Sequence, residues 1–148
     1  MANTADAIMT AAITISGGIV VFGATQLFQR FWLEPIYEHS KAVGAASYAL
    51  YYYGKCYANP GSADEETCKA ASWALRKVAG DLAATASGVR LYYLSRSLRL
   101  VPKRDGVDKA IGNITAISNS LSLGNDGKEN SRWANEAYSL LGIRRFGK

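Results

Sequence analysis

The sequence predicts an all-α protein in which one N-terminal transmembrane helix is followed by a cytoplasmic bundle of about four helices. Three observations support this fold class. Residues 7–29 contain no charged side chain. All 17 Lys and Arg residues lie at or beyond Arg30, and Asp6 is the only charged residue before it. In the rest of the chain apolar residues recur at helical steps of three, four or seven, and no comparable segment alternates as a strand would.

Length and composition limit the architecture. The chain has 148 residues, of which 49% are hydrophobic and 20% are charged, so one folded domain is expected and general disorder is not. The net charge is +5. We therefore divide the chain into residues 1–33, a span with its interface collar, and residues 34–148, a helical domain.

The segment Ala7–Gln29 is predicted to cross a bilayer, because a helix of that length extends about 35 Å. A secretory signal peptide is the alternative, but it requires a positively charged region before the apolar stretch, where only Asp6 is charged. Arg30, Phe31 and Trp32 follow as a basic and aromatic interface collar. The excess of Lys and Arg after the span predicts an inner (cell) membrane protein with its N-terminus outside and its C-terminus in the cytoplasm.

Small residues share one stripe of this segment. Ala11, Thr14 and Gly18 are spaced by three and four residues, and Thr25 lies seven residues beyond Gly18. Small side chains let helices approach closely in lipid. The stripe predicts self-association into a homo-oligomer, and a plain anchor is the alternative.

The first helix of the body is delimited by two prolines. Glu34-Pro35 is expected to break or bend the preceding helix. A helix from residue 36 to about 58 is then expected, ending at the turn Asn59-Pro60-Gly61. Its packing face repeats every seven residues and consists of Ile36, Val43, Leu50 and Tyr57.

The next helix is predicted to be the longest, from residue 64 to about 99. Ser62 and Glu65 have the spacing of a capping box at its start. The apolar face advances by alternating steps of three and four, as in an antiparallel bundle, and consists of Cys68, Ala71, Leu75, Val78, Leu82, Thr85, Val89 and Tyr92.

Two shorter helices are predicted in the last third of the chain. After a loop over 101–106, residues 107–123 present Ile111, Ile114, Ile117 and Leu121 on one face, with Gly124 as the C-cap. After a polar loop over 125–130, a helix over 131–141 ends in a Schellman motif at Gly142. The basic tail 144–148 is expected to be mobile.

Basic residues cluster after Asp81, since no acidic residue occurs between positions 82 and 104. The patch consists of Arg90, Arg96, Arg99, Lys103 and Arg104, with two tyrosines among them. Such a patch suits RNA phosphates and bases, or the headgroups of anionic lipids. The alternative is a solvated helix end where cations favour the helix dipole.

Five tyrosines between residues 48 and 57 exceed what one core face can hold, which leaves either an aromatic contact surface or ordinary packing. The members are Tyr48, Tyr51, Tyr52, Tyr53 and Tyr57.

The sequence contains no catalytic motif, so no enzyme and no cofactor are expected. His39 has no partner at a catalytic spacing, and no histidine is available to activate Ser118, Ser120 or Ser122. A metal site is not expected either. Cys56 and Cys68 flank one loop, where free thiols are favoured over a disulfide.

The stretches Phe28–Ile36, Ala46–Tyr57 and Ala116–Leu121 resemble small single-pass bacterial membrane proteins. The layout is similar to the accessory membrane protein of RNA-targeting type VI CRISPR systems, in which a HEPN-like helical body follows an N-terminal span and assembles into a pore. That resemblance implies a pore or membrane effector in antiphage defence. HEPN ribonucleases carry an Arg shortly before a His on one helix, whereas eight residues separate Arg30 from His39, so no nuclease role follows. The alternative function is a membrane-tethered binding module that docks a protein or RNA through the basic patch.

Overall fold

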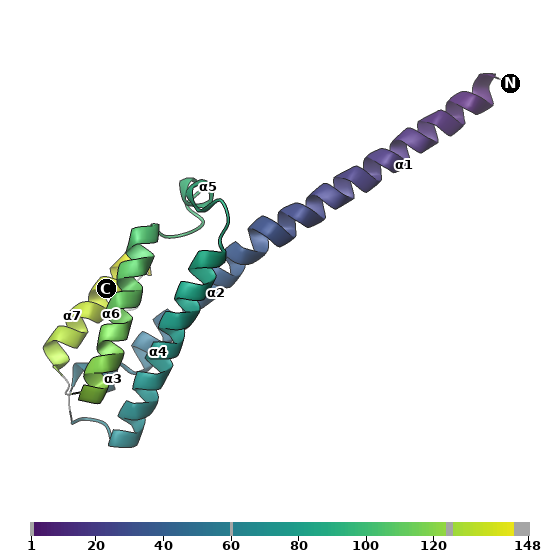
Figure 1. The fold of residues 1–148 in the computed structure, drawn as a ribbon. Helices are drawn as coiled ribbons and strands as arrows, with labels where there is room; N and C mark the ends of the chain where they lie inside the picture. The colour runs from purple at the N-terminus through teal and green to yellow at the C-terminus, as the bar shows by residue number, and fades with distance from the viewer. Residues whose placement is uncertain (1, 60, 124–125, 144–148) are drawn as a thin grey trace. The chain divides into compact units, whose positions relative to one another are not determined.

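The computed structural model describes residues 2–59, 61–123 and 126–143, which form helices and no strand. The predicted all-α class is confirmed. The predicted turn residue Pro60, the C-cap Gly124 and the tail 144–148 lie outside the described residues. In chain order the elements are α1 (Ala2–Phe28), the π-helical turn η1 (Gln29–Leu33), α2 (Glu34–Tyr52), α3 (Gly54–Ala58), α4 (Glu65–Gly88), α5 (Tyr92–Ser97), α6 (Arg104–Leu123) and α7 (Gly127–Leu140) (Figure 1).

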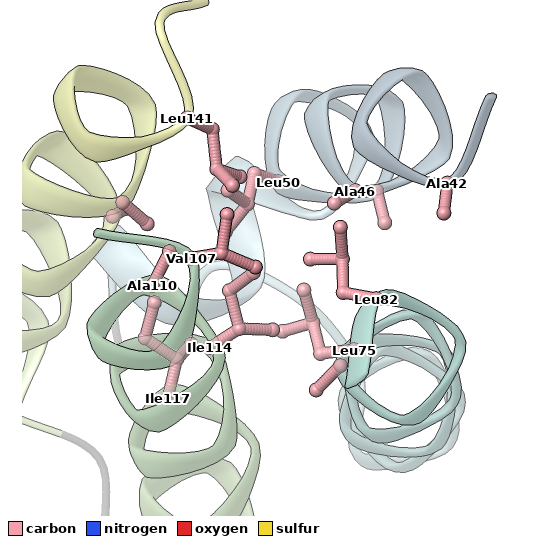
Figure 2. Packing of buried hydrophobic residues seen from close by; sticks show 14 of the residues in the cluster. Ala42, Ala46, Leu50, Leu75, Leu82, Val107, Ala110, Ile114, Ile117 and Leu141 are labelled. Atoms are coloured by element: carbon pink, nitrogen blue, oxygen red, sulfur yellow. The ribbon is translucent and has the colours of Figure 1, made fainter. Parts of the chain in front are cut away.

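Two compact units divide the chain, Met1–Glu34 and Pro35–Lys148. In the second unit α4 packs along α6, and α6 packs along α7 (Figure 1). Their shared core is aliphatic, and Figure 2 shows Ile114 of α6 and Leu75 of α4 pointing toward each other. Helix α2 contributes Ala46 and Leu50 to the same core. The second unit is therefore a helical bundle.

The predicted apolar faces of the two central helices are confirmed within those helices, but Val89 and Tyr92 of the predicted α4 face lie beyond its end at Gly88. On α4, Leu75 and Leu82 are fully buried. On α6, Ile114 and Ile117 are fully buried, whereas Ile111 and Leu121 pack against the core from its edge. Helical spacing of apolar residues identified these faces because only one side of each helix can reach the core.

Serine hydroxyls join α4 to α6 beside this core. The Ser72 hydroxyl donates to the carbonyl of Ser118 at 2.8 Å, and the Ser118 hydroxyl donates to the carbonyl of Ser72 at 2.8 Å. Both side chains are buried. The exchange satisfies two polar groups that would otherwise destabilise the interior, so these serines have a structural role.

The predicted break or bend at Glu34-Pro35 takes the form of a change of helix type: α1 gives way to the π-helical turn η1 and α2 begins at Glu34, while the backbone stays helical throughout. Glu34 has helical dihedral angles, and its N–H donates to the carbonyl of Gln29, five residues back. This is the hydrogen bond of a π-helix, which η1 inserts just before Pro35. Pro35, which has no N–H to donate, lies in the first turn of α2 directly after this π-helical turn.

The predicted helix over 36–58 is two helices, since the chain leaves helical geometry at Tyr53. Leu50 lies in the last turn of α2, where carbonyls lose their intrahelical partners. Its carbonyl accepts instead from the Tyr57 hydroxyl at 2.7 Å. Ile36, Leu50 and Tyr57 are buried as predicted.

Helix α4 is shorter than predicted and has a different N-cap. The Asp64 side chain accepts from the backbone N–H of Thr67 at 2.9 Å, whereas the Ser62 hydroxyl donates to the carbonyl of Lys55. The helix ends at Gly88 rather than near Arg99, and α5 begins after Leu91, which has a positive φ of 53°.

Helices α6 and α7 begin three and four residues earlier than predicted. Asp126 is the N-cap of α7 and accepts from the N–H groups of Lys128 and Glu129. Most of the predicted polar loop 125–130 is thus the first turn of α7. The Schellman motif is confirmed, since Gly142 has φ 68° and the N–H of Ile143 donates to the carbonyl of Tyr138 at 3.0 Å.

Candidate membrane helix and basic cleft

Helix α1 is long and apolar enough to cross a membrane, and none of its most apolar window is buried within the chain. Its 27 residues extend about 40 Å. Large apolar side chains are exposed on every side of it, from Ile8 at 67% to Val20 at 69%. A helix that is apolar all round requires burial in protein or in lipid, and α1 has no such cover in the described chain.

Threonine hydroxyls in α1 are satisfied by its own backbone. Thr10 donates to the carbonyl of Asp6 at 2.8 Å, Thr14 to that of Thr10 at 2.9 Å, and Thr25 to that of Val21 at 2.8 Å. Hydrocarbon offers no hydrogen-bond partners, so a span must satisfy its polar groups internally. These three hydroxyls meet that requirement.

The predicted small-residue stripe, Ala11, Thr14, Gly18 and Thr25, is exposed along α1. A Cβ atom added to Gly17, Gly18 or Gly23 would meet no atom of the chain within 4 Å. The chain itself therefore sets no steric requirement for glycine at these positions.

The predicted interface collar lies in η1. The ring of Trp32 packs edge-on against Phe28 with centroids 4.6 Å apart. Phe31 is 46% exposed, and Arg30 is exposed beside it. The collar thus presents aromatic and basic groups directly after the apolar helix, as an interface anchor would.

The structure brings together three of the five predicted basic residues. Arg96, Arg99 and Lys103 line a shallow cleft of about 560 Å³, together with Ser40 of α2 and Ser139 of α7. All three cations are exposed. Arg90 is exposed but does not line this cleft.

Arg104 is used for structure rather than for this surface. Its guanidinium donates to the carbonyl of Ala86 in the last turn of α4 and lies 5.5 Å from the centre of the Tyr92 ring. Its Nε atom is 3.7 Å from a carboxylate oxygen of Asp108. The Arg104 cation gives a partner to a carbonyl that has none within the helix, and it interacts favourably with the negative end of the helix dipole. Both effects stabilise the end of α4 at this position.

Sequence reasoning missed a group of exposed apolar residues in the same region. Leu91, Leu94 and Leu98 are 65%, 47% and 53% exposed. On the predicted long helix these leucines lay between basic residues and off the apolar face. The sequence therefore predicted no function for them. Their spacing of three and four was the available sequence signal.

His39 is fully buried at the start of the bundle. Its Nδ1 atom is 3.2 Å from the Thr85 hydroxyl, which itself donates to the carbonyl of Asp81 at 2.8 Å. The hydroxyl therefore accepts from Nδ1–H, and Nε2 is the unprotonated nitrogen, with no partner among the described residues. Burial, and then the positive charge of Arg104, lower the pKa of His39.

The lowered pKa of His39 predicts a loss of stability in mild acid. The unfolded histidine titrates near 6.5 and binds a proton that the folded one resists, so the free energy of unfolding is highest above pH 6.5 and falls below it. The slope should approach about 1.4 kcal/mol per pH unit. Urea unfolding in detergent between pH 5 and 7.5 measures this slope. The matched variant His39→Gln should flatten it, and an equal slope in that variant would assign the effect to other groups.

The two cysteines are free thiols that lie beside each other, Cys56 on α3 and Cys68 on α4. Burial, and then the neighbouring Cys68 thiol, raise the pKa of Cys56 to about 11. Cys56 is thus protonated at neutral pH and is a poor nucleophile.

The tyrosine cluster is divided between core and surface. Tyr57 is buried and Tyr53 packs at the core edge, whereas Tyr48, Tyr51 and Tyr52 are 65%, 75% and 62% exposed. Tyr48 and Tyr52 stack with ring centroids 5.6 Å apart. Ordinary packing therefore accounts for Tyr53 and Tyr57, whereas Tyr48, Tyr51 and Tyr52 remain on the surface.

Among the described residues, no three His, Cys, Asp or Glu side chains are grouped so as to hold a metal ion. Comparisons with known protein families, with curated proteins and with solved structures found no match.

Proposed function

We propose that the protein is a single-pass membrane protein whose spans associate into a homo-oligomer, and that the oligomer acts on the membrane as a pore or effector. The observation that carries this proposal is the exposure of apolar side chains on every side of α1. Lipid is the environment in which that surface is stable. The distribution of basic residues orients the N-terminus outside and the bundle in the cytoplasm.

Two separate surfaces support assembly. The span carries Ala11, Thr14 and Gly18 on one stripe, where close packing substitutes for a hydrophobic driving force. The bundle carries the exposed tyrosines of α2, which offer aromatic contact area to a second copy. Identical subunits joined through both surfaces would close into a ring with cyclic symmetry. Antiphage defence as the setting rests on the resemblance in layout.

Replacing Gly18 by leucine is expected to lower the number of subunits in the oligomer and the leakage that it causes. A Cβ atom at this position meets no other part of its own chain within 4 Å, so we expect the effect to come from contact with another chain. Native mass spectrometry of detergent-extracted protein counts the subunits, and dye release from liposomes measures leakage. Membrane insertion should be unchanged.

The matched control is Gly17→Leu, which adds the same side chain at the same depth about 100° around the helix. Position 17 is equally open within the chain. Equal effects of the two substitutions would contradict a specific packing face. Wild-type protein that is monomeric in detergent and in lipid, and that leaves membrane potential unchanged, would overturn the oligomer.

A membrane-tethered binding module is the second candidate, and the basic cleft favours it. Arg96, Arg99 and Lys103 line one concavity together with two serines, a composition that suits an anionic partner. A protein or RNA held there would be recruited to the membrane by α1. A monomer that binds such a partner, with no leakage, would select this function over the pore.

A further inference from the structure

The segment from residue 89 to residue 100, which contains α5 and is called here the α5 segment, is fixed to the bundle on one side and apolar on the other. Val89 and Ser95 are buried, and Val101 is buried directly after the segment. The Tyr92 hydroxyl donates to the carbonyl of Pro102 at 2.9 Å, which ties α5 to the following loop. Five large apolar side chains nevertheless remain exposed, Leu91, Tyr93, Leu94, Leu98 and Leu100.

The charge beside these side chains is positive. Arg96, Arg99 and Lys103 line the cleft that adjoins the segment. Among the described residues, no carboxylate lies within ion-pair distance of Arg96 or Arg99, and Lys103 has only the exposed Asp105 at 3.6 Å. Exposed leucines beside exposed cations are the composition of an element that lies in a membrane interface.

The α5 segment lies at the end of the bundle where α2 begins. His39 of α2 contacts Thr85 of α4, and its ring lies 6.4 Å from that of Tyr92 in α5. His39 follows Trp32, the last residue of the interface collar, by seven residues, which limits the distance between them to about 25 Å. Chain connectivity therefore keeps the segment within reach of any membrane that holds the collar.

We propose that the α5 segment docks on the surface of an anionic lipid bilayer. Leu91, Leu94 and Leu98 enter the interfacial region, and Arg96, Arg99 and Lys103 contact lipid phosphates from the cleft. The inference rests on the proposed membrane anchor and adds a second, composition-dependent contact to it. Lipid is favoured over RNA because four of the five exposed apolar side chains of the segment are leucines and Tyr93 is its one exposed aromatic ring, whereas proteins that bind single-stranded nucleic acid stack successive bases on several aromatic side chains.

Hydrogen–deuterium exchange of the full chain in lipid nanodiscs tests this docking. Amides of residues 89–100 should exchange more slowly in discs containing phosphatidylserine than in discs of phosphatidylcholine alone, and 0.5 M salt should reduce the difference. Amides of α1 report the anchor in the same experiment and should be protected in both lipids.

Two variants separate the contributions of charge and apolar contact. The triple variant R96Q/R99Q/K103Q should weaken docking by up to about a hundredfold, since each basic residue near an anionic surface contributes about fivefold. The variant L94S/L98S should also lose the protection. The control K69Q/K77Q/R132Q removes the same charge from exposed positions elsewhere in the bundle and should keep it.

The outcomes distinguish the two proposals. Equal exchange of residues 89–100 in both lipids, with α1 protected, would overturn docking and leave the anchor. Unprotected α1 amides would overturn the membrane anchor. Exchange of residues 89–100 in vesicles with and without phosphatidylserine would then still test the docking of the α5 segment. Protection of the segment in phosphatidylcholine discs by a single-stranded RNA oligonucleotide, without any effect of anionic lipid, would replace lipid by nucleic acid.

Discussion

Replacing Gly18 and Val21 together by arginine is expected to release the protein from membranes. Both positions lie near the middle of the apolar segment, and Val21 is 66% exposed. Each arginine at the centre of a span costs about 2.5–3.5 kcal/mol on insertion scales, so the pair costs about 5–7 kcal/mol. Sedimentation of cell lysates after carbonate washing should move the variant from the pellet to the supernatant.

Two comparisons sharpen this experiment. The double variant with alanine at both positions should stay in the membrane fraction, because it alters side-chain size without adding charge. The intact mass of the membrane-extracted protein separates an anchor from a cleaved signal peptide, since cleavage would remove α1. Wild-type protein that is soluble without detergent would exclude a membrane span.

Leu75→Ala is expected to cause the largest loss of bundle stability, about 2–5 kcal/mol. Leu75 is fully buried at the contact between α4 and α6, where it faces Ile114 (Figure 2). Truncation removes apolar contacts and leaves a cavity between two helices that serines also hold together. Urea unfolding in detergent, followed by far-UV circular dichroism, measures the change.

The matched control is Leu123→Ala, the same substitution at a side chain that is 87% exposed at the end of α6. Its effect should stay within about 0.5 kcal/mol. Equal losses in the two variants would show that the packing of α4 on α6 does not provide the stability of the bundle.

Local patterns in the sequence were sufficient to predict a structural feature wherever that feature depends on neighbouring residues alone. The uncharged stretch predicted α1, and helical spacing predicted the buried faces of α4 and α6. The Schellman motif at Gly142 was also predictable, because its requirement for a positive φ is local.

The candidate site was predictable in composition but not in arrangement. The sequence identified five basic residues, yet Arg96, Arg99 and Lys103 line the cleft while Arg104 bonds the end of α4. Which of these residues line the cleft depends on where α4 ends and on how the chain turns at Leu91 and Arg99, both of which have a positive φ. Because the sequence did not predict these turns, it did not predict that the leucines of the α5 segment are exposed.

By itself, the sequence determined that this chain is helical, that one helix is apolar on every side, and which faces of the central helices are buried. These properties follow from the order of apolar and charged residues along the chain. Only the tertiary structure decided where helices stop and which polar groups are used internally. The carbonyl of Leu50 accepts from Tyr57, and the carbonyl of Ala86 accepts from Arg104, eighteen residues away in sequence. Such donors reach the carbonyls at the helix ends only after the chain has folded back on itself. Local helix propensity therefore does not predict these hydrogen bonds.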